Sequence, residues 1–478
     1  MPTPGRLFLR TISYIVPLCL TSIASGAQSA ADTLRALVAL DGIAVAEADR
    51  LERAIWPGFR FDSAGLLYIV PRVGKVALRW PGAPPSGMRP LEGAAGAFWA
   101  DTQAVRWGPG VAAATLAVSA DATPADVLAL AVHEAFHAYQ VTERRTGRRF
   151  GRPDNAMLTA RYPIFDIENE AAFAAESRLL RRAVEAPTDS AARRLAAEFL
   201  AVRLHRQARL DTALVEYEKT AELHEGIAQY ALLTGLRTLA ERHDALREGA
   251  RAEHRREAET LDRTLDLTSL SVRRRFYATG SHLALVLDRL AGDSWKERLI
   301  RDDAWLQDVL ARTIGGGAQS SGARPAIEPL IPEAVRAVEA LRARRVAVRD
   351  SLLAGSGTTL VLDLSSGAEW CFFDPQNVLT TGGSQLLHMR VLRLCLDDRL
   401  TAQFDQPVIE DRWVRIATTL ARSALEVTAD GRPIAVPAPG VAHVAERVRV
   451  RGDGVDVAAA RAVLIGGRDR LTIVPLVP

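Results

Sequence analysis

Two histidines and a glutamate lie close enough in the sequence to support metal-dependent hydrolysis. His133, Glu134 and His137 stand in the stretch VHEAFH. Positions i and i+4 share one face of a helix, so both imidazoles can reach one ion and Glu134 projects beside them. Zinc readily binds neutral imidazoles and a carboxylate, and it leaves a fourth position for water, whose pKa it lowers. The pattern predicts a Zn²⁺ site with His133 and His137 as ligands and Glu134 as the general base.

The residues around this motif predict the helix that would hold it. Thr123 can cap a helix N-terminus, Pro124 suits the first helical position, and Asp126 completes a start that resembles a capping box. Gly147 is typical of a helix end. We therefore expect a helix from Pro124 to about Arg145.

The third metal ligand should come from one of two acidic segments further along the chain. These segments are IENEA and ELHEGIAQY, and their candidate ligands are Glu168, Glu170, Glu222 and Glu225. Each could supply the carboxylate that completes a zinc site. Glu222 lies one helical turn before Glu225, so it could instead accept a hydrogen bond from a ligand imidazole.

The second segment resembles the gluzincin zinc metallopeptidases, and especially their zinc aminopeptidase branch. In those enzymes a Glu-Gly-x-Ala helix after HExxH supplies the third ligand, which implies Glu225. The first segment resembles the Asn-Glu-Ala ligand helix of thermolysin-like enzymes, which would imply Glu170. The interval from His137 to Glu225 is 88 residues, longer than in either family. Gly226 and Ala228 are small enough to let this helix approach the HExxH helix closely.

A tyrosine further on fits the same resemblance. Tyr277 and Gly280 match a Tyr-x-x-Gly motif of zinc aminopeptidases, whose phenol stabilises the tetrahedral oxyanion, and Tyr277 follows Glu225 by 52 residues. The resemblance implies this role for Tyr277, with His282 as a weaker candidate. The chain has no Gly-Ala-Met-Glu-Asn segment, the element with which aminopeptidases bind a substrate N-terminus, so we do not infer exopeptidase specificity. Ala114–Ala120 could form an edge strand that pairs with an extended peptide.

The pattern of apolar residues predicts an α+β fold with two regions. Residues 32–55 and most of 124–313 have helical spacing, and short strand-like runs lie between these segments. After residue 355 apolar and polar residues alternate, and Asp430-Gly431 is typical of a hairpin turn. We expect a mostly helical, zincin-like domain with a small N-terminal sheet at 28–355. A β-rich accessory domain should follow at 356–478.

The N-terminus predicts export. Arg6 and Arg10 precede a short apolar run that ends in Ser25-Gly26-Ala27, as in a secretory signal peptide cleaved near Ala27. The run is shorter than a membrane span, so we expect a secreted or periplasmic protein without stable membrane insertion. In an oxidising compartment Cys371 and Cys395 could form a disulfide between two strands of the β-rich domain, or remain buried thiols.

The balance of charge argues against a nucleic-acid partner. The chain has 60 basic residues, only three of them lysines, and 57 acidic residues, which gives a net charge of +3. This charge is too small for a protein that coats nucleic acid. We interpret the arginine runs 273–275 and 342–345 as solvated surface. The sequence thus favours a zinc metallopeptidase with a peptide or protein substrate, and it says nothing of oligomeric state. The alternatives are a catalytically silent binding module, against which Glu134 argues, and a zinc hydrolase of a non-peptide amide.

Overall fold

The computed structural model describes residues 30–476, except for 71–73, 79–88, 91–104, 108–110, 120, 144–146, 317–322, 356, 366–368, 373–377, 381–384, 397–398, 412–414 and 421–424. The expected signal peptide at 1–27 lies outside the described residues. The chain divides into two compact units: the first runs to Val141 and includes Ala231–Glu253, and the second comprises Thr142–Tyr230 and His254 onward. None of the helices in the described ranges has both the length and the apolar character needed to cross a membrane.

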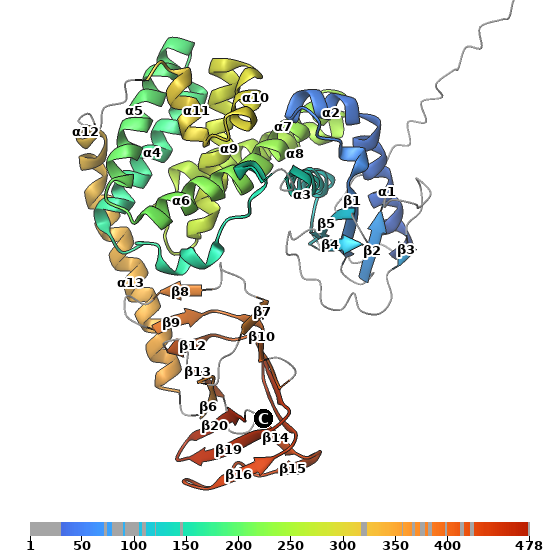
Figure 1. The fold of residues 1–478 in the computed structure, drawn as a ribbon, viewed down its shortest axis with the longest axis vertical. Coiled ribbons are helices and arrows are strands. Elements are labelled where there is room, and N and C mark those ends of the chain that lie inside the picture. Colours follow the sequence, from blue (N-terminus) through green and yellow to red (C-terminus); the bar gives the residue numbers. More distant parts are fainter. Residues whose placement is uncertain are drawn as a thin grey trace, which may run out of the picture. The chain divides into compact units, whose positions relative to one another are not determined.

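The first unit combines helices with the small sheet expected near the N-terminus. Its helices are α1 (Ala30–Ala46), α2 (Ala48–Ile55) and most of α3 (Pro124–Glu143). The sheet has the order β3-β2-β1-β5-β4, and β1 and β5 are parallel. The strands are β1 (Gly65–Val70), β2 (Gly74–Leu78), β3 (Arg89–Pro90), β4 (Val105–Trp107) and β5 (Val111–Ala117) (Figure 1).

Strand β5 is only partly the edge strand that the sequence suggested. Val111–Ala113 pair with β4, and Ala113 also pairs with Gly65 of β1. Ala114–Ala117 pair with β1, and no other described strand pairs with them. In the sheet order β5 stands between β1 and β4, so the expectation of an edge strand is wrong for the strand as a whole, although the segment Ala114–Ala117 pairs on one side alone within the described ranges.

The second unit begins with a group of packed helices. Its helices are α4 (Ile167–Glu185), α5 (Asp189–Gln207), α6 (Thr212–Ala221), α9 (Val272–Ala291), α10 (Ser294–Arg301), α11 (Leu306–Thr313), α12 (Arg324–Ile327) and α13 (Ile331–Leu353) (Figure 1). A π-helical turn, Glu222–Gly226, joins α6 to α7 (Ile227–Ala240). Helices α7 and α8 (Arg247–Asp262) each belong partly to both units. Short 3₁₀ helices occupy Phe61–Ser63, Arg149–Gly151, Ala156–Arg161, Asp244–Leu246 and Glu328–Leu330.

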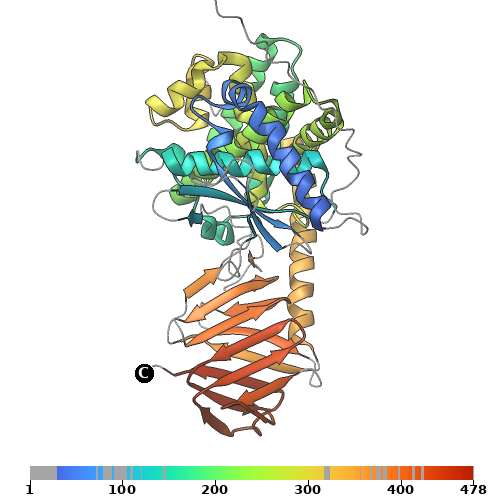
Figure 2. The same ribbon diagram turned by 90° about the vertical axis from the view of Figure 1, so that its right-hand side faces the viewer.

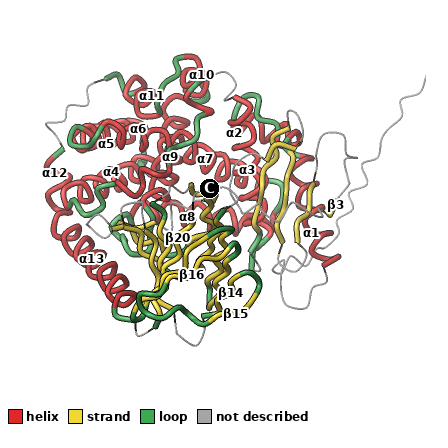
Figure 3. Tube along the Cα trace, turned by 60° about the horizontal axis from the view of Figure 1, so that its bottom comes forward, coloured by secondary structure: helices red, strands yellow, loops and turns green. Residues whose placement is uncertain are grey.

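Two sheets make up the C-terminal part of the second unit, beside α13 (Figures 2 and 3). One has the order β15-β14-β17-β18-β11-β10-β7 and the other β16-β19-β20-β6-β13-β12-β9-β8. The first eight strands are β6 (Thr358–Asp363), β7 (Glu369–Phe372), β8 (Val378–Thr380), β9 (Gln385–His388), β10 (Val391–Leu396), β11 (Leu400–Phe404), β12 (Val408–Asp411) and β13 (Arg415–Leu420). The rest are β14 (Glu426–Ala429), β15 (Arg432–Ile434), β16 (Ala442–Ala445), β17 (Val448–Gly452), β18 (Val455–Ala459), β19 (Ala462–Gly467) and β20 (Arg470–Pro475).

A shared apolar core between these sheets explains the alternating pattern of the sequence. Leu362 and Leu464 from one sheet and Leu400 and Val457 from the other belong to one buried cluster. Less buried residues such as Asp363, Thr401 and Asp456 alternate with them, as expected for strands with one buried face. Helices followed by a β-rich region confirm the predicted α+β class.

Two local predictions in this region can be compared with the structure. Asp430 and Gly431 have φ values of +50° and +78° between β14 and β15, which confirms the hairpin turn. Cys395 on β10 is disulfide-bonded. The side chain of Cys371, its expected partner, lies outside the described residues.

Candidate metal site

The HExxH helix begins as its sequence predicts. The backbone N–H of Thr123 donates to Asp126 Oδ2 at 2.9 Å, and the N–H of Asp126 donates to Thr123 Oγ1 at 3.2 Å, which is a reciprocal capping box. The helix ends at Glu143, and Gly147 follows with a φ of +76°. This start fixes the position of the turn from which the histidines project.

The two histidines face each other on α3. Their Nε2 atoms are 3.1 Å apart, and both side chains are buried. Two nitrogen ligands at about 2.05 Å from a tetrahedral zinc would be roughly 3.3 Å apart, so the observed separation fits a shared ion. Gln140 Oε1 accepts a hydrogen bond from His137 Nδ1 at 2.8 Å. In a neutral ring this bond places the proton on Nδ1, so that Nε2 carries the lone pair that a metal binds.

Packing within the first unit holds this face of α3 in place. The Phe136 ring lies 6.0 Å from the Trp56 ring and 5.3 Å from the Phe59 ring. On α7, a Cβ at Gly235 would lie 3.0 Å from the side chain of Val132, the residue before His133. The absence of a side chain at Gly235 thus permits close packing of α7 against α3. The histidines therefore stand on a helix that is supported by both aromatic packing and a second helix.

Glu225 lies in the π-helical turn that precedes α7. Its side chain is fully buried, and its Oε1 accepts from Arg273 Nη2 at 2.5 Å. Arg273 also donates to both carboxylate oxygens of Asp154, at 2.9 and 3.0 Å. Single π-helical turns occur frequently at functional sites, because the wider turn redirects side chains that a regular helix would place elsewhere. Arg273 thus fixes the orientation of the Glu225 carboxylate.

The structure places Tyr277 beside Glu225 and Arg273. Arg273 Nη1 donates to the Tyr277 hydroxyl at 2.9 Å. Burial, and after it the negative charge of Glu225, raise the pKa of Tyr277 well above its ordinary value. The phenol consequently keeps its proton at neutral pH and remains a hydrogen-bond donor. Phe276 anchors this turn of α9, with its ring 5.5 to 5.8 Å from those of Tyr162, Phe173 and Tyr217.

His282, the weaker candidate for the same role, is bonded within its own helix. Its Nδ1 lies 2.9 Å from the backbone oxygen of Ala278, and its side chain is buried. Burial lowers the pKa of His282 to about 4, so the ring is neutral at physiological pH. This arrangement favours Tyr277 as the donor.

The other candidate carboxylates are bound by arginines. Glu170 accepts from Arg275 Nη1 at 2.7 Å, and burial raises the pKa of Glu170. Glu222 accepts two bonds from Arg203, at 2.7 and 2.8 Å, and one from the Thr279 hydroxyl. Glu168 pairs with Arg209 at 2.9 Å. Glu222 therefore anchors the π-helical turn to α5 and α9.

Sequence reasoning missed two residues of this site, Asp154 and Arg273. Asp154, His224 and Glu225 offer ligand atoms that all lie within 4.8 Å of one another, a grouping that could hold a metal ion. Asp154 stands in a loop without a recognisable motif. Arg273 precedes Tyr277 by four residues, a helical spacing that would have linked the two.

The interpretation of the arginine runs as solvated surface is wrong for three of their members. Arg275 is fully buried, only 16% of the Arg273 side chain is exposed, and Arg345 is 6% exposed. Burial of a guanidinium requires partners that compensate for lost hydration. For Arg273 and Arg275 these include the acidic residues Asp154, Glu225 and Glu170, which are distant in sequence.

The glycines of the Glu-Gly-x-Ala and Tyr-x-x-Gly motifs pack against each other. A Cβ at Gly226 would lie 2.5 Å from the Cα of Gly280, and a Cβ at Gly280 would lie 2.6 Å from the backbone oxygen of Glu222. The small size of Gly226 therefore serves the contact with α9. We expected it to serve an approach to the HExxH helix, a contact that Gly235 makes instead.

A Gly226→Ala substitution should destabilise the protein by about 3 kcal/mol, because backbone atoms cannot move aside as a flexible side chain would. Gly42→Ala is the matched control: Gly42 is exposed within α1, and a Cβ there would meet no residue from another part of the chain within 4 Å. That variant should be more stable by roughly 0.5–1 kcal/mol. Chemical denaturation measures both, and equal effects would contradict the proposed close approach.

Comparison with known proteins returned no match: neither a family model, nor a curated protein, nor a solved structure is similar to this chain. Functional inference therefore rests on the residues themselves. In the first unit these are His133, Glu134 and His137, and in the second Glu225, Tyr277, Arg273 and Asp154.

Proposed function

We propose that this protein is a secreted or periplasmic zinc-dependent peptidase. The observation that carries the proposal is the His133–His137 pair, whose Nε2 atoms are 3.1 Å apart beside Glu134 on one helix. Two neutral imidazoles at this separation are a suitable donor set for zinc. Glu134 is unnecessary for a purely structural metal, which favours catalysis over a silent binding module.

Glu225 is our proposed third ligand. It lies two residues before α7, and Gly235 of the same helix packs against Val132 in the first unit. Glu170, Glu222 and Glu168 each pair with an arginine outside the candidate site. Arg273 holds one oxygen of Glu225, as partners of ligating carboxylates commonly do.

The remaining residues have roles that follow from their chemistry. Bound zinc would lower the pKa of water and polarise the scissile carbonyl. Glu134 would accept a proton from the attacking water and return it to the leaving amine. The protonated Tyr277 phenol would donate to the developing oxyanion, and Arg273 would hold both Tyr277 and Glu225 in place. Ala114–Ala117 could pair with an extended peptide backbone.

Ligand choice can be tested with isosteric variants. Glu225→Gln should weaken zinc binding by roughly 100-fold or more, since loss of an outer partner alone costs 10- to 100-fold. Glu170→Gln should change the zinc affinity less than about threefold, because Glu170 pairs with Arg275. Competition with a chelator measures both affinities. Zinc released by Glu170→Gln and retained by Glu225→Gln would reverse the assignment.

Export can be tested on the full-length chain. Expression with its native N-terminus in a bacterium should deliver protein outside the cytoplasm, because the basic head and short apolar run suit the secretion machinery. N-terminal sequencing of that protein should begin at Gln28, after cleavage following Ala27. Uncleaved protein that begins at the initiator and stays in the cytoplasm would contradict the proposed compartment.

A further inference from the structure

A cavity of about 250 Å³ lies within the second unit, and none of the residues proposed for zinc is part of its wall. Its wall comes from α13, from the segment that leads into α9, and from strands β8 and β9 (Figure 1). Leu267, Leu341, Val378 and Leu387 contribute apolar surface, and Arg345 is among the polar residues of the wall. Since one water takes up roughly 30 Å³ in the liquid, the space admits a small organic molecule.

Arg345 is an unusual residue to find in such a wall. Only 6% of its surface is exposed, and its Nη1 donates to the backbone oxygen of Thr380 at 2.6 Å. Its Nε has no hydrogen-bond partner, and no carboxylate in the described ranges forms an ion pair with Arg345. Burial and the positive charge of Arg275 lower the pKa of Arg345 to about 10. A buried guanidinium without an anion is costly to the fold.

Arg275 is a second buried arginine, and its positive charge acts on Arg345. It is fully buried and donates through Nη1 to Glu170, while its Nε and Nη2 have no hydrogen-bond partner. Glu170 is thus the one carboxylate that pairs with either cation among the described residues. Its charge compensates Arg275 and leaves that of Arg345 unbalanced. An anion in the adjoining cavity would balance it.

We propose that this cavity binds a small molecule with one carboxylate and an apolar body. The carboxylate would pair with the Arg345 guanidinium, and the apolar body would contact the leucine and valine side chains of the wall. One buried guanidinium in the wall suits a singly charged group better than a phosphate dianion, which needs several donors. The wall shares no residue with the proposed zinc site, and the proposal does not rest on peptidase activity.

Octanoate and 1-octanol form a matched pair of probes, because they share a chain and differ in the charged head. Calorimetric titration of the full chain should show octanoate binding at least about tenfold tighter than 1-octanol. In Arg345→Met the preference for octanoate over 1-octanol should fall below about twofold. Arg336→Met, at an exposed position on the same helix, should keep the wild-type preference.

A second variant keeps the test decisive if Arg345→Met does not fold. Val348→Trp leaves Arg345 in place and fills the cavity from a half-buried position of its wall. It should abolish octanoate binding, and octanoate should raise the Tm of wild type but not of this variant. Absence of octanoate binding to wild type at 10 mM, or an unchanged preference in a folded Arg345→Met, would overturn the proposal.

Discussion

Glu134→Gln should lower peptide hydrolysis by about 10²- to 10⁴-fold while zinc binding stays near the wild-type level. A glutamine keeps the shape of the side chain but cannot accept a proton from water, and general base catalysis is worth a factor of this size. Neither ligand imidazole is altered, so the metal should remain bound. A mixed peptide library assays cleavage, and elemental analysis of the same samples measures zinc.

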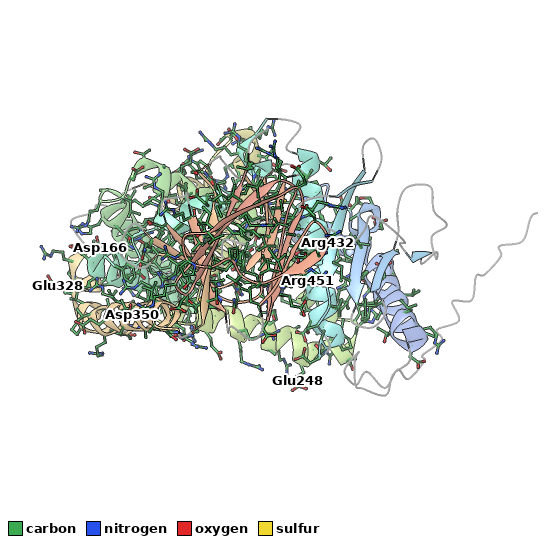
Figure 4. All side chains as sticks on the ribbon, turned by 90° about the horizontal axis from the view of Figure 1, so that it is seen from below. Asp166, Glu248, Glu328, Asp350, Arg432 and Arg451 are labelled. Atoms are coloured by element: carbon green, nitrogen blue, oxygen red, sulfur yellow. The ribbon has the colours of Figure 1, made fainter. Side chains whose placement is uncertain are left out.

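The matched control is Glu248→Gln, on α8, whose exposed side chain is labelled in Figure 4. It should retain full activity. Cleavage that persists in Glu134→Gln, or zinc that is indifferent to His133→Ala, would contradict the proposed mechanism. Zinc without cleavage of any peptide would favour the binding module, and cleavage confined to non-peptide amides would favour the alternative hydrolase.

Arg206→Met should destabilise the protein by about 3–5 kcal/mol. Arg206 is 1% exposed, and it donates to Glu176 at 2.6 Å and to both oxygens of Glu218, at 2.5 and 2.9 Å. Methionine fills much of the same space but leaves two buried carboxylates without this cation. Removal of one partner from a buried ionic network costs this much because the remaining charges cannot regain their hydration. Denaturant unfolding followed by circular dichroism measures the loss.

Arg194→Met is the control on the same helix, α5. Arg194 pairs with Glu198 at 3.1 Å, and the two side chains are 66% and 44% exposed. Exposed pairs of this kind contribute little, so the variant should change stability by less than about 0.5 kcal/mol. If Arg206→Met changed the free energy of unfolding as little as Arg194→Met, the buried network would not be important for the stability of the fold.

The Arg206 network also connects stability to the candidate site. Glu176 accepts from Arg203 as well as Arg206, and Arg203 binds Glu222, the first residue of the π-helical turn. Glu225 lies in the same turn. A defect in this network should therefore weaken zinc binding as well as stability, although none of its residues is a proposed ligand.

The sequence alone predicted those features that depend on neighbouring residues. The capping box at Thr123 and Asp126, the helix that carries His133 and His137, and the Asp430-Gly431 turn all involve groups within a few residues of one another. Their hydrogen bonds and dihedral preferences act locally. The α+β class followed for the same reason, since apolar periodicity reports which face of each element is buried.

Only the tertiary structure decided which arginines are buried and which acids they bind. Arg273 donates to Asp154, which lies 119 residues earlier in the chain, and Arg275 donates to Glu170, which lies 105 residues earlier. It also showed that Gly226 faces Gly280 and that Gly235 is the glycine packed against the HExxH helix. Pairings between distant segments depend on how helices cross. A short run of sequence carries no information on that crossing, because the same charged residue is solvated on one face and buried on another.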